Sequence, residues 1–121
     1  MKRDFDLIRR ILTDIENMPA NKRYTDISYL TDHDPSTVYA HIELLLDAGL
    51  IKGDLTKMMG GGRSISINGL SWPGHDFLDA TKDDTIWNKA KESVLKPGAS
   101  ITFGLLLEWL KIEAKQKLGL P

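Results

Sequence analysis

The stretch from Asp34 to Leu50, DPSTVYAHIELLLDAGL, constrains the fold most because both of its ends are marked. Asp34 is a residue type that caps helices, and Pro35 suits the first helical position because proline has no backbone N–H. Apolar residues then recur with helical spacing at Val38, Ile42, Leu45 and Leu46. Gly49 suits the left-handed conformation that ends many helices. The sequence therefore predicts one amphipathic helix over 35–48.

A strand and a glycine-rich hairpin are predicted to follow this helix. Candidate strands cover 50–55 and 64–68, and serine alternates with isoleucine in the second, as in a half-buried strand. Between them, Lys57-Met-Met-Gly-Gly-Gly-Arg63 is typical of an exposed hairpin tip. This order of helix, strand and hairpin is that of winged-helix domains. The segment 24–30 fits either a third strand or a second helix, and its Tyr, Thr and Ile content favours the strand.

Apolar patterns predict further helices on both sides of this region. One is expected over 4–17, and three more over 72–80, from 83 or 84 to about 96, and from 100 onwards. We expect an α+β fold in a single domain of 121 residues. A winged-helix-like core with a small antiparallel sheet would occupy 1–70, and a helical extension would occupy 71–121.

Composition limits the classes of function. The chain has no cysteine, which excludes disulfides, thiolate nucleophiles and cysteine metal sites. The start, MKRDFDLIRR, lacks the apolar segment of a signal peptide. The longest apolar cluster, 105–107, is interrupted by Glu108 and is far too short to span a membrane. We therefore expect a cytoplasmic protein that does not enter membranes.

Charge is distributed unevenly, although the formal net charge is only -1. Residues 24–50 include five acids and no Lys or Arg, which weighs against DNA binding because phosphate contacts need cations. The helix nevertheless presents polar residues of the kind that winged-helix proteins place in the major groove, and the hairpin adds two cations. The candidate DNA-binding residues are Ser36, Thr37, Tyr39, Lys57 and Arg63. Two hypotheses follow: a regulator that binds duplex DNA, or a module that binds another protein.

Two other clusters suggest chemistry but have simpler structural interpretations. His75, Asp76 and Asp79 could contribute to a metal site, because His75 and Asp79 are separated by one helical turn. Local pairing of these two residues, with Asp83 or Asp84 capping the next helix, is the favoured interpretation. The three glycines before Arg63 could cradle a phosphate, but a plain hairpin tip is favoured.

The sequence contains no catalytic or dinucleotide signature. We therefore expect no enzymatic activity and no cofactor. His41 lies beside core position Ile42 and is expected to be packed and hydrogen-bonded.

The tryptophans and the last helix raise the question of self-association. Trp72, Trp87 and Trp109 are expected to anchor the core or an interface. The last helix is apolar on two sides, with Phe103, Leu106 and Leu110 on one and Leu105, Trp109 and Ile112 on the other. A helix enclosed by the fold and a homodimer contact explain this equally well. The dimer hypothesis assigns the interface to Phe103, Leu106, Trp109 and Leu110.

Three stretches of the chain combine into one resemblance. They are the opening MKRDFDLIRRIL, the central AHIELLLDAGLI and LSWPGHDFLDATKDDTIWNKAKE from Leu70 to Glu92. The last joins Trp-x-Gly-His-Asp-Phe-Leu-Asp to Asp-Asp-x-x-Trp-x-Lys. Together they resemble a family of small, uncharacterised prophage-associated bacterial proteins grouped as a domain of unknown function. The resemblance implies a bacterial or phage origin and a winged-helix-like fold, and it implies no activity.

Overall fold

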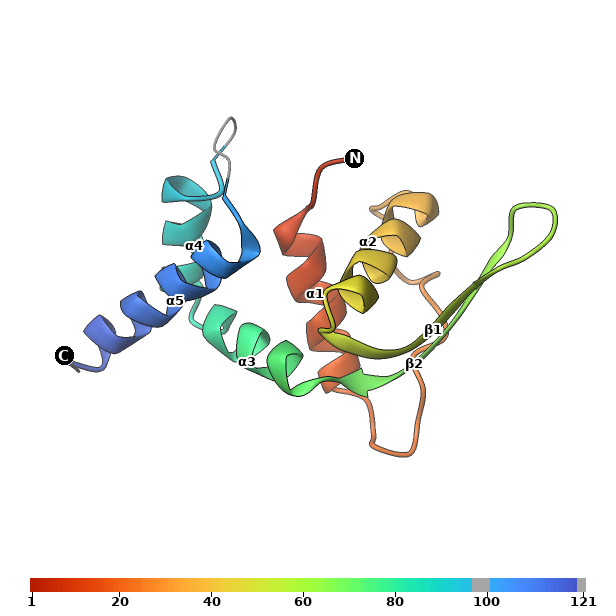
Figure 1. Ribbon diagram of the computed structural model, residues 1–121, viewed down its shortest axis with the longest axis horizontal. Helices are drawn as coiled ribbons and strands as arrows, with labels where there is room; N and C mark the ends of the chain where they lie inside the picture. Colours follow the sequence, from red (N-terminus) through yellow and green to blue (C-terminus); the bar gives the residue numbers. More distant parts are fainter. Residues whose placement is uncertain (97–100, 120–121) are drawn as a thin grey trace. The chain divides into compact units, whose positions relative to one another are not determined.

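The computed structural model describes residues 1–96 and 101–119, and the chain forms two compact units, Met1–His75 and Asp76–Pro121. Figure 1 shows the elements in chain order. They are α1 (Phe5–Glu16), α2 (Pro35–Asp47), β1 (Ile51–Lys57), β2 (Arg63–Leu70), α3 (Trp72–Thr81), α4 (Asp84–Ser93) and α5 (Phe103–Lys117). The predicted α+β class is confirmed, with a small antiparallel sheet followed by further helices. No helix within the described residues is both long and apolar enough to cross a membrane.

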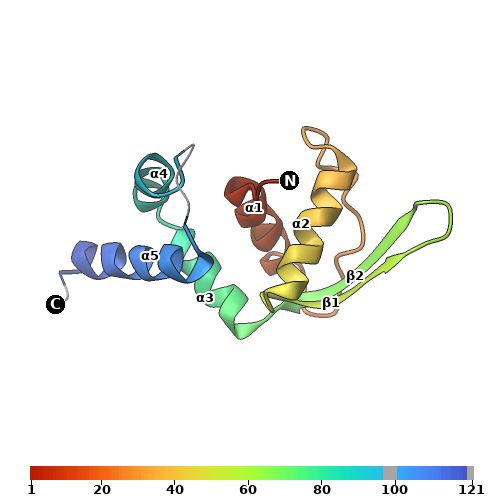
Figure 2. The ribbon, with the colours of Figure 1, turned by 45° about the horizontal axis from the view of Figure 1, so that its top comes forward.

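The first unit is built on α1 and α2, which lie side by side in Figures 1 and 2. Asp4 caps α1 by accepting a hydrogen bond from the Leu7 N–H at 3.1 Å. Each helix buries a stripe of apolar side chains, as the spacing predicts. The buried residues are Leu7, Ile8, Ile11, Leu12 and Ile15 of α1 and Val38, Ile42 and Leu45 of α2. Leu46, predicted in the α2 stripe, is only half-buried, as is Phe5 at the start of α1.

The two ends of α2 differ in how well the sequence predicts them. Asp34 takes the N-cap position and Pro35 the first turn, but the Asp34 carboxylate makes no capping hydrogen bond. At the other end Gly49 has a φ of 72°, the left-handed value expected of it. The Leu50 N–H then donates to the Leu45 carbonyl at 3.0 Å, which turns the chain directly into β1.

Strands β1 and β2 form the antiparallel hairpin that the sequence predicts, with slightly longer strands. Ile65 and Ile67 are buried, whereas the alternate β2 residues face outward or are half-buried. The register shifts between Lys52 and Gly53, where Gly53 has a φ of 150° opposite Ile67. A Cβ at Gly53 would lie 2.7 Å from the Ile67 Cα, so this bulge requires glycine.

The third strand predicted over 24–30 is wrong beyond its first residue. Tyr24 forms a single bridge to Ile67, with N–O distances of 2.9 and 3.0 Å. The Asp26 carboxylate then accepts hydrogen bonds from the Ser28 N–H at 2.8 Å and the Ser28 hydroxyl at 2.9 Å. This local turn uses the Ser28 backbone N–H, which would otherwise be available to a sheet ladder. The segment forms no helix either, so the sheet within the described residues has two strands and one bridge.

The first turn of α3 belongs to the first unit and packs tightly within it. The Ser71 hydroxyl accepts from the Gly74 N–H at 3.1 Å and donates to the Gly49 carbonyl at 2.5 Å. Gly74 packs directly on the Leu50 carbonyl, where any side chain would overlap the oxygen. The glycine of the Trp-x-Gly-His run is therefore a packing requirement.

The second unit contains the rest of α3 with α4 and α5. Asp83 caps α4 by accepting from the Ile86 N–H at 3.0 Å, which confirms one of its two predicted caps. Helix α4 ends at Ser93, short of the predicted Lys96. Thr102 caps α5, whereas Ser100, the predicted start of this helix, lies outside the described residues. The buried side chains of this unit include Phe77, Leu78, Trp87, Ala90, Leu106 and Leu110.

Candidate functional site

The hairpin carries two cations onto the outward face of α2. Lys57 of β1 pairs with Arg63 of β2. This pair is two residues closer to the hairpin tip than the Leu55–Ile65 pair. Because side chains alternate along a strand, this distal pair faces the same side as buried Ile65. That side of the hairpin faces α2. Lys57 and Arg63 therefore lie beside α2, although both lie outside the acidic segment 24–50.

Two contacts join the hairpin to α2. The Arg63 guanidinium lies 5.8 Å from the centroid of the Tyr39 ring, within cation–π range. Lys57 Nζ lies 3.7 Å from Glu43 Oε1. Exposed Ser36 precedes Tyr39 by one helical turn. We call Ser36, Tyr39, Glu43, Lys57 and Arg63 the α2–hairpin surface.

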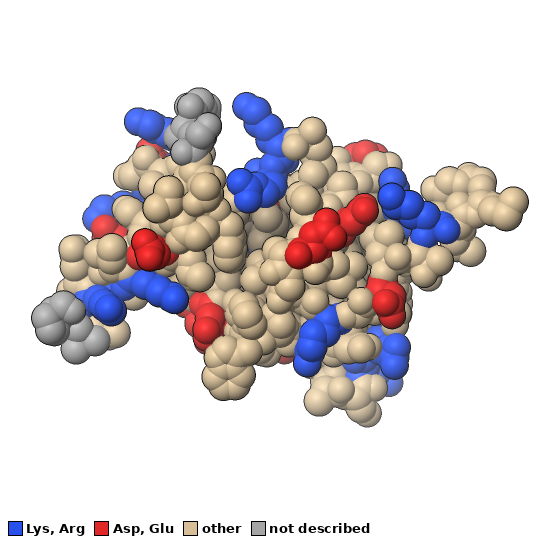
Figure 3. All heavy atoms as spheres, in the orientation of Figure 1, with Lys and Arg blue, Asp and Glu red and all other residues tan. Residues whose placement is uncertain are grey.

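The α2–hairpin surface carries more positive than negative charge, whereas the charged residues of α2 alone are all acidic. Lys57 and Arg63 supply two cations against the single carboxylate of Glu43, and that carboxylate is already paired. Both members of the pair are well exposed, so the pair contributes little to stability, about 0–1 kcal/mol. Figure 3 shows basic atoms on the hairpin beside acidic atoms on α2, and an uncharged hairpin tip.

Four of the five predicted DNA-binding residues contribute to this surface. Ser36, Tyr39, Lys57 and Arg63 lie on it. Thr37 is half-buried, and its carbonyl oxygen accepts a hydrogen bond from the buried His41 ring. Glu43 is one of the five acids of 24–50 that weigh against DNA binding in the sequence. Its pairing with Lys57 depends on the strand register, which the sequence does not indicate.

The glycine-rich tip is organised as a hairpin turn. Gly60 and Gly61 have φ values of 89° and 94°, which other residues rarely adopt. The Met58 N–H donates to the Gly62 carbonyl at 2.7 Å, and the Gly61 N–H donates to the Met58 carbonyl at 3.2 Å. These two N–H groups are therefore already used, which favours the hairpin tip over a phosphate cradle. Met59 projects from the tip fully exposed.

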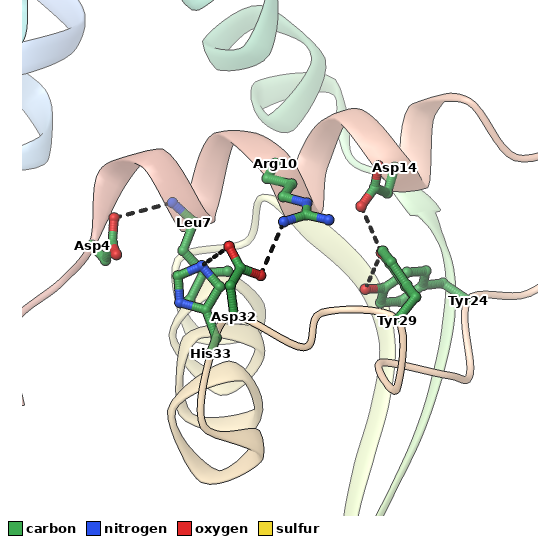
Figure 4. A network of polar contacts seen from close by, with 8 residues as sticks. All are labelled: Asp4, Leu7, Arg10, Asp14, Tyr24, Tyr29, Asp32 and His33. Atoms are coloured by element: carbon green, nitrogen blue, oxygen red, sulfur yellow. Dashed lines mark hydrogen bonds and ion pairs between the residues drawn. The ribbon is translucent and has the colours of Figure 1, made fainter.

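A polar network holds the long connection that precedes α2, as Figure 4 shows. The Tyr29 hydroxyl donates to Asp14 of α1 at 2.5 Å and lies 2.8 Å from the Tyr24 hydroxyl. Because Tyr29 has given its only proton to Asp14, Tyr24 must be the donor to Tyr29. Nearby, Arg10 of α1 donates to Asp32 at 3.3 Å. The connection is thus fixed to α1 without a helix of its own.

The surroundings of the two tyrosines favour the neutral phenols. Burial is the main reason that the pKa of Tyr24 is raised. The pKa of Tyr29 is raised much further, first by burial and then by the hydrogen bond to the Asp14 carboxylate. A phenolate at Tyr29 would lose this bond and face a like charge. Both groups are therefore neutral phenols near neutral pH and act as fixed hydrogen-bonding groups.

His41 is a core residue, as the sequence predicts. Its ring is completely buried, and Nε2 lies 2.8 Å from the Asp4 backbone nitrogen. A backbone N–H can only donate, so Nε2 is the acceptor and the imidazole proton sits on Nδ1. Nδ1 lies 2.8 Å from the Thr37 carbonyl oxygen and donates to it. His41 therefore joins the start of α1 to the first turns of α2.

The structure gives His75 and Asp79 separate partners. His75 Nδ1 lies 3.4 Å from Glu16 Oε2, and Asp79 Oδ1 lies 3.0 Å from Lys82 Nζ. These two contacts take the place of the predicted local pairing of His75 with Asp79. Asp76 is exposed. Across 1–96 and 101–119, no three His, Asp or Glu residues gather closely enough to hold a metal ion.

The residues assigned to a dimer interface separate into two groups. Leu106 and Leu110 are completely buried, and the Phe103 ring lies 4.9 Å from the ring of Phe77. Trp109 is half-buried on another side of α5. The first three residues serve the core of the second unit, so only Trp109 of the four remains accessible to a partner.

The tryptophans also differ from one another. Trp87 is buried, as expected of a core anchor, but Trp72 is 82 % exposed at the first position of α3. A core role for Trp72 is therefore wrong. Gly74, two residues later, faces the Leu50 carbonyl, and residues two apart lie on roughly opposite sides of a helix, so Trp72 faces away from this contact.

The fold and the α2–hairpin surface define a small α+β protein with a helix and a hairpin that share one polar face. The chain matches the family described as "Hypothetical protein (DUF2513)" over residues 2–100. It is also 36 % identical over 98 residues to a Haemophilus influenzae protein described as "Uncharacterized protein", covering 78 % of this chain and 79 % of that one. No solved structure gave a significant match. The chain therefore belongs to the DUF2513 family.

Proposed function

We propose that the protein binds duplex DNA through the α2–hairpin surface and acts as a small winged-helix regulator of phage or prophage origin. The observation that carries the proposal is the position of Arg63 and Lys57 against the outward face of α2. A helix flanked by a basic hairpin matches the way in which winged-helix domains approach a duplex.

Each residue of the surface has a distinct task in this proposal. Arg63 and Lys57 contact phosphates, because these contacts supply most of the affinity of nonspecific complexes. Ser36 and Tyr39 present hydroxyl groups on α2 to phosphates or base edges. Glu43 opposes the DNA backbone, and its pairing with Lys57 moderates this repulsion.

Binding of a random duplex, followed by fluorescence anisotropy from about 50 to 200 mM salt, tests the proposal. We expect affinity to fall steeply with salt in the wild-type protein. Arg63→Ala should weaken binding and make the log–log salt slope shallower by about 1, because one phosphate contact is lost. Lys111→Ala, which removes an exposed cation of α5, is the matched control and should leave the slope unchanged.

Glu43→Gln gives a second arm of the same test. It removes a negative charge and frees Lys57 for a phosphate, so duplex affinity should rise severalfold. An absence of binding at the lowest salt, or an Arg63→Ala slope equal to that of the wild type, contradicts the proposal.

A protein-interaction module is the second candidate function. Its support is the acidity of α2, where Asp47 adds to Glu43, and the fully exposed side chain of Met59 at the hairpin tip. Two results together would support this function. The protein would not bind duplex DNA even at low salt, and Met59→Ser would weaken its binding to a phage or host protein.

A further inference from the structure

Helix α5 has a second apolar face that the second unit leaves uncovered. Leu106 and Leu110 are completely buried, yet Leu105 is 57 % and Ile112 54 % exposed, and Trp109 is half-buried. Large apolar side chains that gather on one exposed helix face mark an interaction surface more often than scattered ones do. The spacing of these exposed residues and the charges on either side of them indicate what would cover this face.

The exposed residues follow the spacing of a helix-pairing seam. Leu105, Trp109, Ile112 and Gln116 are separated by four, three and four residues. This alternation keeps one line of side chains facing a neighbouring helix over nearly two heptads. The pattern is independent of the buried Leu106–Leu110 line, so α5 can contribute to its own core and contact a second helix.

The charges that flank the seam select a partner and its direction. Glu108 and Lys115 are exposed on one flank, seven residues apart, and Glu113 lies on the other. In a parallel pair of α5 helices, Glu108 would face the partner's Glu113, which is already paired with Lys89 and offers Glu108 no attraction. In an antiparallel pair, Glu108 faces the partner's Lys115, and symmetry repeats this attractive contact. Glu113 is already paired with Lys89 at 2.9 Å.

We propose that the occupant is a second copy of this chain, with its α5 packed antiparallel along Leu105, Trp109 and Ile112. The contact is isologous, so it closes as a dimer and does not extend into a filament. It goes beyond the proposed DNA binding and does not depend on it. A seam of nearly two heptads is short, and we expect the dissociation constant to lie in the micromolar range, about 1–100 µM.

Sedimentation equilibrium of the full chain, without DNA, measures the association. The wild-type mass should rise from monomer to dimer with concentration. Glu108→Lys and Lys115→Glu should each weaken the dimer about tenfold, because each change turns two attractive contacts into repulsive ones. The double variant E108K/K115E restores the attraction with its direction reversed and should recover near-wild-type affinity. Lys111→Glu, on the same helix but outside the seam, is the matched control.

Leu105→Glu provides an independent arm, because this side chain is exposed and its replacement should not disturb folding, as circular dichroism can verify. We expect it to abolish the dimer. A monomer at every concentration, an assembly larger than a dimer, or a double variant no better than the single ones overturns the proposal. Because DNA is absent, these outcomes are separate from those of the duplex-binding test.

Discussion

At the scale of single residues, His41 shows how one side chain can join two helices. Both ring nitrogens are satisfied by backbone groups, the Asp4 N–H on one side and the Thr37 carbonyl on the other. A buried group that loses such a partner costs about 1–3 kcal/mol, whereas forming the bond contributes less. The residue therefore acts on stability through the backbone groups that it satisfies.

Replacing His41 with Phe keeps the volume and removes both hydrogen bonds. We expect the free energy of unfolding, measured by urea denaturation, to fall by about 2–4 kcal/mol. His75→Phe, at an exposed histidine, is the control and should change stability by less than about 0.5 kcal/mol. A His41→Phe variant as stable as the wild type would show that the two backbone groups find other partners.

At the scale of elements, the bulge in β2, where Asn68 has no partner opposite Lys52 and Gly53, affects where the hairpin directs its cations. The register shift between Lys52 and Gly53 lies two pairs before Leu55–Ile65. Bulges bend a strand and increase its twist, so this one affects how the distal Lys57–Arg63 pair approaches α2. The shape of the candidate site thus depends on a glycine that is distant from it in the hairpin.

Gly53→Ala should destabilise the protein by about 2 kcal/mol or more, because a Cβ would meet the backbone of the opposite strand at a φ that alanine avoids. Gly62→Ala is the matched control in the same hairpin, since its Cβ would meet only the Met58 side chain at 3.8 Å and above. Thermal melting compares the two variants. Equal melting temperatures would mean that the bulge relaxes without cost.

At the scale of the whole molecule, groups at the two ends of the pH range limit stability. The pKa of Asp83 is lowered, chiefly by its contact with Lys117 and then by the cap of α4. This contribution is present above the ordinary carboxyl pKa near 3.8 and is lost as the pH falls below it. The raised pKa values of Tyr24 and Tyr29 act oppositely. Their contribution is complete below about pH 10 and disappears as the pH rises further.

We therefore expect the free energy of unfolding to pass through a plateau between about pH 5 and 9 and to fall on both sides. Tyr29→Phe should reduce the alkaline fall, because the variant has one phenol fewer to ionise, and should leave the acid fall unchanged. Asp83→Asn should do the reverse. Denaturant titrations across the pH range measure both, and identical profiles for all three proteins would contradict these assignments.

The sequence predicts which residues form the candidate site, but it does not predict how they contact one another. Ser36, Tyr39, Lys57 and Arg63 were identifiable because helix periodicity and hairpin punctuation are local properties. The Arg63–Tyr39 and Lys57–Glu43 contacts were not, because they depend on strand register and on the bulge at Gly53. The residues of α5 were identified as two-sided, but which side faces the core depends on packing against distant elements.

The sequence by itself determined the helices, the hairpin and the buried stripes, because capping, periodicity and glycine conformation act over a few residues. The tertiary structure decided the remainder. Tyr24 joins the sheet by only one bridge because Asp26 turns the chain away, and Trp72 is exposed because Gly74, on the opposite side of the same turn, takes the contact with Leu50. Lys57 and Arg63 contact α2 because the hairpin formed by β1 and β2 folds back beside this helix. These outcomes depend on contacts between residues far apart in the chain, which no local pattern encodes.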